Sequence, residues 1–154
     1  MRRRNQRGLT LVELIVAFTI LAVLSTMSVP LLRYRVRVEQ ERDLRYRLEE
    51  IRRAIDKYKD AADAGKFQIK VGTEGYPETL EVLVEGVEVS GSADGSKLKF
   101  LRRIPVDPMT GKAEWGLRSM QDDPNSTSWG GENVFDVYSK TMERARDGTP
   151  YSEW

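Results

Sequence analysis

The sequence predicts an α+β fold in which one long N-terminal helix packs on a small antiparallel β-sheet. Apolar residues recur at helical spacing between residues 44 and 62, beyond an uncharged run at 14–32, which indicates one helix over roughly 10–64. Most Gly and Pro residues follow residue 65, where short apolar segments alternate with turn signals. A sheet laid on the apolar side of the helix is the simplest way to cover it.

Length and composition limit the possible functions. The chain has 154 residues, enough for one domain and an appendage. Its net charge of +1 argues against a nucleic-acid partner bound through phosphates. Cys and His are absent, which excludes disulfides, thiolate zinc sites and Cys/His catalysis. No nucleophile elbow or Gly-rich phosphate loop is present, so we expect a structural protein and not an enzyme.

The first element is an apolar segment that begins after an arginine-rich start. Residues 14–32 carry no charge and would span about 28 Å as a helix, close to the roughly 30 Å hydrocarbon core of a bilayer. The four arginines within residues 1–8 predict that the N-terminus stays in the cytoplasm. Glu13 lies directly before this uncharged run, within an apolar stretch that begins at Leu9, and an unpaired charge there costs about 2.5 kcal/mol or more in hydrocarbon.

Two ordinary explanations fit this segment poorly. A cleaved signal peptide has a basic start, but its apolar core is shorter and ends in a small-residue cleavage site. A plain N-terminal anchor matches the length, yet it leaves Glu13 without a role.

Gly8 followed by Leu9-Thr10-Leu11-Val12-Glu13 resembles the class III signal of type IV prepilins and type II secretion pseudopilins. The resemblance implies that prepilin peptidase removes the leader 1–8 by cutting between Gly8 and Leu9, and that the new Leu9 amine is methylated. It also implies that Glu13 and Pro30 occupy positions that matter for assembly, within a transmembrane or filament-core helix over 9–32.

Physical chemistry agrees with this reading. Glycine lets a peptidase approach the backbone closely because it has no Cβ. In a filament, Glu13 of one subunit would pair with the Leu9 ammonium of a neighbour, and pairing is how proteins tolerate a buried charge. Pro30 either kinks or loosens the helix, or ends it at the membrane edge.

The amphipathic continuation of the helix covers residues 33–65. Six apolar residues, spaced four and three apart, form one face: Leu44, Leu48, Ile51, Ile55, Tyr58 and Ala62. We interpret this face as the core of a small domain, because an independent coiled coil needs more heptads. Gly65 is the expected terminator.

Residues 66–154 form the predicted globular domain. A turn at Tyr76-Pro77 leads into a short helix with Leu80, Leu83 and Val84 facing inward. "GVEVSGSADGS" indicates a short strand and turn, and "FLRRIPVDPMTG" an extended loop, because Pro restricts the residue before it. "AEWGLRSM" and "NVFDVYSK" are the best strand candidates, and together these segments predict two to four strands.

"YPETLEVLV", "FLRRIPVDPMTG" and "FDVYS" resemble, in order, segments of the G-type major pseudopilin of type II secretion. In that family the loop after the last segment binds calcium. Asp136 and Ser139 match the start of the motif, and Asp147 is a further candidate ligand. Asp122, Asp123 and Glu153 could add oxygens, since calcium takes six to eight. The alternative is that these residues only form polar turns.

The sequence therefore predicts a single-pass inner-membrane protein with a cytoplasmic N-terminus and a periplasmic domain. The resemblance implies that it polymerises with itself and other pseudopilins, and that membrane lipid, prepilin peptidase and the inner-membrane secretion platform are its partners. Two alternatives remain: a type IV pilus pilin or minor pilin, and a membrane-anchored periplasmic binding module that never polymerises.

Overall fold

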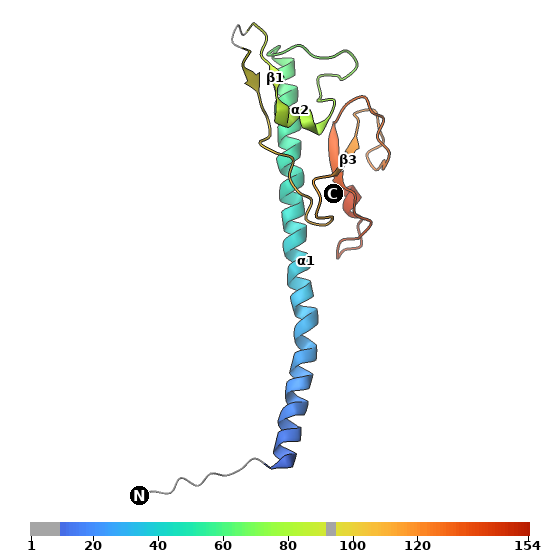
Figure 1. Cartoon of the computed structure of the whole chain (residues 1–154). Coiled ribbons are helices and arrows are strands. Elements are labelled where there is room, and N and C mark those ends of the chain that lie inside the picture. The colour runs from blue at the N-terminus through green and yellow to red at the C-terminus, as the bar shows by residue number, and fades with distance from the viewer. Residues whose placement is uncertain (1–9, 92–94) are drawn as a thin grey trace, which may run out of the picture. The chain divides into compact units, whose positions relative to one another are not determined.

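The computed structural model describes residues 10–91 and 95–154, with side chains described throughout except at 26–33. Its longest element is α1, Leu11–Asp63, which confirms the single helix expected over roughly 10–64 (Figure 1). Gly65 follows with a φ of 66°, and its N–H donates to the Ala62 carbonyl at 2.9 Å. A left-handed glycine of this kind satisfies the last carbonyls of a helix, so Gly65 terminates α1 as predicted.

The chain divides into two compact units, Met1–Glu39 and Gln40–Trp154. The described part of the first unit is the beginning of α1. The second unit holds the rest of α1 together with the other described elements. These are α2 (Leu80–Glu85), β1 (Val87–Glu88), β2 (Lys97–Leu98), β3 (Trp115–Arg118), β4 (Asp136–Ser139) and the 3-10 helix η1 (Tyr151–Glu153).

The α+β class is confirmed, but the strands form two separate antiparallel pairs where one sheet was predicted. β1 pairs with β2 through Val87↔Leu98 and Glu88↔Lys97. The short strand expected in "GVEVSGSADGS" is confirmed as β1. β2 was not predicted, because its two residues have no alternating neighbours to reveal a period. The predicted strands at 113–120 and 133–140 are confirmed at their centres as β3 and β4.

The β3–β4 pair departs from simple alternation of buried and exposed positions. Gly116 lies opposite Tyr138, and a Cβ added to Gly116 would come within 2.2 Å of the Tyr138 ring. The ring therefore lies across the glycine, and the Tyr138 hydroxyl donates to the Thr127 carbonyl at 2.9 Å. Because a loop covers this second face of the strand, Val137 and Tyr138 are both buried.

The predicted apolar face of α1 is the centre of the core. All six residues of that face are buried, and Leu44 and Ile51 have no exposed surface. α2 contributes Leu80 and Leu83 as predicted, while Val84 is only partly buried. Ala54 and Ala61 of α1 are also buried, and the remaining buried members of this core come from other parts of the chain: Phe67, Leu101, Trp115, Val134, Val137, Ala145 and Tyr151.

Candidate functional site

α1 begins with a capping arrangement that the sequence reasoning missed. The Glu13 N–H donates to the Thr10 hydroxyl at 3.3 Å, and the Leu14 N–H donates to the Thr10 carbonyl at 3.1 Å. Thr10 is therefore the N-cap, and Thr10-x-x-Glu13 is the sequence of a capping box, which could have been found. A carboxylate in the first turn also interacts favourably with the helix dipole. Glu13 thus helps to start α1 and remains exposed at its first turn.

The apolar side chains on both sides of Glu13 have no cover in the described chain. The large ones between residues 11 and 24 are exposed by half or more: Leu11, Val12, Leu14, Ile15, Val16, Phe18, Ile20, Leu21, Val23 and Leu24. An exposed apolar surface of this extent marks contact with lipid or with other protein.

Polar groups in the same stretch are satisfied by the helix itself. The Thr19 hydroxyl donates to the carbonyls of Ile15 and Val16 at 3.0 and 2.8 Å. The Ser25 hydroxyl donates to the Leu21 carbonyl at 2.8 Å. Hydroxyls that donate to the helix backbone in this way suit apolar surroundings.

Among the residues that the structure describes, no helix is both long and apolar enough to cross a membrane.

The other predicted processing and assembly residues are described in part or not at all. Gly8 and Leu9, with the rest of the leader, lie outside the described residues. Pro30 lies within the continuous helix α1, so the helix does not end there as one alternative expected. Its side chain is outside the described set, and its role in assembly stays a prediction.

The three predicted calcium ligands are each bound by a different partner. Ser139 donates from its hydroxyl to a carboxylate oxygen of the buried Asp107 at 2.7 Å. Asp147 accepts from the Thr149 hydroxyl and amide at 2.6 and 3.0 Å. These bonds from Thr149 hold the pKa of Asp147 below its ordinary value.

Asp136, the third predicted ligand, lies between two arginines. Arg52 of α1 donates through Nε to one carboxylate oxygen at 2.6 Å, and Arg118 of β3 approaches the other at 3.4 Å. Both guanidinium groups also hold the chain near η1: Arg52 donates to the Trp154 carbonyl and Arg118 to the Ser152 carbonyl, each at 2.6 Å. We call Arg52, Asp136 and Arg118 the arginine clamp.

These residues do not fit a shared calcium ion. A cation at Asp136 would meet two guanidinium charges, and Ser139 and Asp147 use their oxygens elsewhere. Asp122, a further candidate, accepts from the amides of Ser119 and Gly130 at 2.7 and 3.1 Å. Within residues 10–91 and 95–154, no group of three or more acidic side chains is placed to hold a metal.

Comparison with known proteins locates one signature at the N-terminus. Residues 3–29 match the prokaryotic N-terminal methylation motif. The methylation motif is the signature of type IV prepilin-like proteins, pseudopilins included, and supports a type IV pilin-like substrate of prepilin peptidase. The motif implies a membrane-anchored N-terminal region. The proteins that carry it are of a structural, pilin-like type. No curated protein and no solved structure gives a significant match.

Proposed function

We propose that this chain is a structural subunit of a type II secretion pseudopilus. It is inserted in the inner membrane with its N-terminus in the cytoplasm, cut between Gly8 and Leu9, and polymerised in the periplasm to aid protein export. The observation that carries the proposal is the methylation motif joined to a helix whose apolar side chains, from Leu11 to Leu24, are exposed. Polymerisation would cover that surface.

Glu13 has a defined task in this proposal. Cutting after Gly8 removes every leader arginine and creates an ammonium at Leu9. That ammonium on one subunit would pair with Glu13 on the next, so the cost of a carboxylate in apolar surroundings is offset only in the polymer. The same fold would serve a type IV pilus subunit, and recovery of surface fibres without a secretion defect would favour that reading.

Processing provides the first test. Gly8→Val adds a β-branched side chain where the peptidase must approach the backbone. We expect the variant to remain at full precursor mass in the inner membrane. The wild type is expected to lose residues 1–8 and to carry one methyl group on Leu9.

The matched control is Asn5→Val, which makes a similar change in the leader away from the cleaved bond. It should be processed like the wild type. Normal cleavage of Gly8→Val, measured by intact mass, would contradict the proposal.

A further inference from the structure

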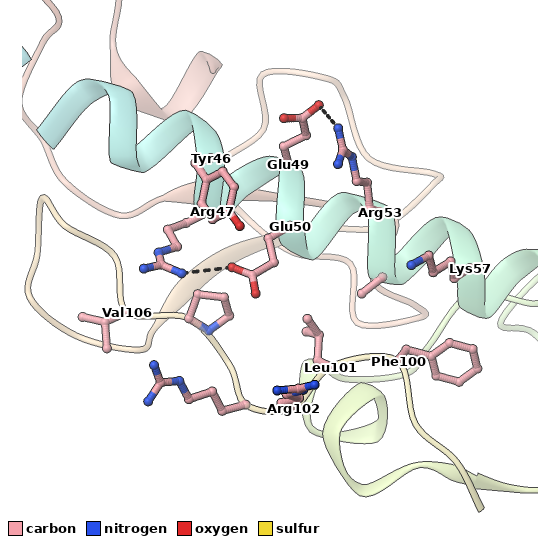
Figure 2. A pocket seen from close by; sticks show the side chains of 13 residues that line it. Tyr46, Arg47, Glu49, Glu50, Arg53, Lys57, Phe100, Leu101, Arg102 and Val106 are labelled. Carbon is pink, nitrogen blue, oxygen red and sulfur yellow. Dashed lines mark hydrogen bonds and ion pairs between the residues drawn. The ribbon is translucent and has the colours of Figure 1, made fainter. Parts of the chain in front are cut away.

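A charged groove lies beside α1 in the second unit, outside the features described so far. One wall is the exposed side of α1 over residues 46–57, and the other is the segment 100–106 (Figure 2). The cavity volume is about 560 Å³. Tyr46 and Val106, both more than half exposed, add apolar surface to its rim.

The groove carries an excess of positive charge. Its two acids are already paired, Glu50 with Arg47 at 3.1 Å and Glu49 with Arg53 at 2.7 Å. Three further cations, Lys57, Arg102 and Arg103, line the groove and are exposed. None of these three forms an ion pair with another described residue. The groove thus offers three unneutralised cations beside apolar surface, which suits an acidic protein segment.

The same chain carries such an acidic segment. Residues 71–91 contain five glutamates and no Lys or Arg. Glu81 and Glu85 are four residues apart on α2, and Leu80 and Leu83 of α2 face the core. Positions four apart share one helix face, so these carboxylates point outward together. Glu81, Glu85 and the following Glu88 are exposed and form no ion pair within the described residues.

We propose that the groove of one copy binds the acidic segment 81–88 of the next copy. This inference rests on the proposed polymer. Groove and segment of a single chain form no ion pair with each other among the described residues, so their charges are left for a neighbour. Because the two surfaces differ, the contact is heterologous, and a heterologous contact that does not close a ring builds an open filament.

Charge complementarity of this kind acts on assembly in a recognisable way. Each exposed ion pair is weak by itself and is screened by salt. In a filament the same ion pairs recur at every contact between subunits, so their small free energies add up along the filament. They also disfavour subunits that align with like charges facing each other. We therefore expect filament recovery to fall as ionic strength rises, and like charges placed across the contact to block it.

The test is charge reversal in the full chain, with sheared filaments recovered from cells that make each variant at equal levels. Arg102→Glu/Arg103→Glu and, separately, Glu81→Lys/Glu85→Lys are each expected to lower recovery about tenfold. Combining all four changes restores opposite charges and should return most of the recovery. Lys112→Glu/Lys140→Glu changes two exposed lysines outside the groove and should have little effect.

Crosslinking identifies the partner directly, because the chain has no cysteine of its own. Arg103→Cys combined with Glu85→Cys should give a ladder of multimers with a short thiol crosslinker, and each single variant should give none. The pair Arg103→Cys with Glu132→Cys tests the exposed acid of another loop, and a ladder there instead would overturn the assignment.

Unchanged recovery after either reversal, or no rescue by the four-fold combination, would also overturn the inference. In both cases wild-type filaments would still form, so the proposed function would stand. Failure of the wild type to polymerise would instead remove the proposed function, together with this inference.

Discussion

Residues 11–24 and residues 44–62 lie on the same helix and are both rich in apolar side chains, but they are covered differently. The first set is exposed over its whole circumference in the described chain. The second set has one apolar face, and α2, β3, β4 and η1 cover it. A helix that is apolar all round needs a partner outside its own chain, whereas an amphipathic helix needs only its own domain.

The two regions therefore respond differently to substitution. Substitutions in Gln40–Trp154 should change the free energy of unfolding of that unit, because its core is internal. Substitutions in the apolar part of Met1–Glu39 should change assembly instead, because nothing in the described chain packs against it.

Glu13→Ala should abolish filament recovery while the variant is cut and anchored normally. The change removes one member of the proposed Glu13–Leu9 pair and leaves an ammonium unpaired in apolar surroundings, which is the damaging case. The Thr10 hydroxyl still accepts from the amide of residue 13 in this variant, so helix stability should fall only by the lost interaction of the carboxylate with the helix dipole, about 0.5 kcal/mol. The measurement is sheared-filament recovery together with the melting temperature of the full chain in detergent.

Glu39→Ala removes another exposed acid of α1 and serves as the control for Glu13→Ala. Filaments from Glu13→Ala at the wild-type level would break the pairing mechanism and favour an anchored module that does not polymerise.

Ile51→Ala should lower the free energy of unfolding by about 3 kcal/mol, because it leaves a cavity at a fully buried position. Ile15→Ala, at a position 52% exposed, should leave that free energy unchanged in the full chain in detergent. Chemical denaturation measures both variants. Equal losses from the two substitutions would show that the two regions are not separable.

Arg118→Met should lower the free energy of unfolding by about 2 kcal/mol, because hydrogen bonds to a charged group are worth roughly 1.5–3 kcal/mol. The side chain of Arg118 is only 5% exposed, and its loss leaves the Ser126 and Ser152 carbonyls without a donor. Arg53→Met is the control, since its pair with Glu49 is exposed and worth about 0.5 kcal/mol. Equal effects would argue against the clamp.

Calcium should give the smallest effect. Arg52 and Arg118 already contact the Asp136 carboxylate and would repel a cation there, so calcium should not shift the melting temperature of the full chain. The family resemblance makes the opposite prediction, since a ligand bound only by the folded state raises that temperature. Calorimetry with millimolar calcium and with chelator decides between them, and a clear rise would contradict the arrangement around Asp136.

Local patterns predicted the long elements of this fold well. The apolar period of residues 44–62 predicted the buried face of α1, and Gly65 predicted its end. Both predictions succeeded because each signal is carried by residues that are close together in the sequence. The strands at β3 and β4 were found for the same reason.

Contacts between distant residues could not be read in this way. Arg52 and Asp136 are 84 positions apart, and no local period relates them. Asp136 therefore looked like a metal ligand in sequence, whereas its surroundings are two arginines. The capping role of Thr10 could have been predicted from the sequence, since Thr10-x-x-Glu13 is a short local motif.

The order in which the core is completed has a consequence for the newly made chain. Glu41 accepts a hydrogen bond from the Tyr151 hydroxyl at 3.0 Å, across 110 positions of sequence. Val134, Val137, Ala145 and Tyr151 complete the cover of the α1 face. At synthesis rates of about 5–20 residues per second, the apolar face of α1 stays uncovered for several seconds until these residues are synthesised. During this interval the nascent chain exposes the apolar face of α1, and we expect chaperones to bind that face. We also expect ribosome-stalled chains that lack residues 134–151 to be degraded.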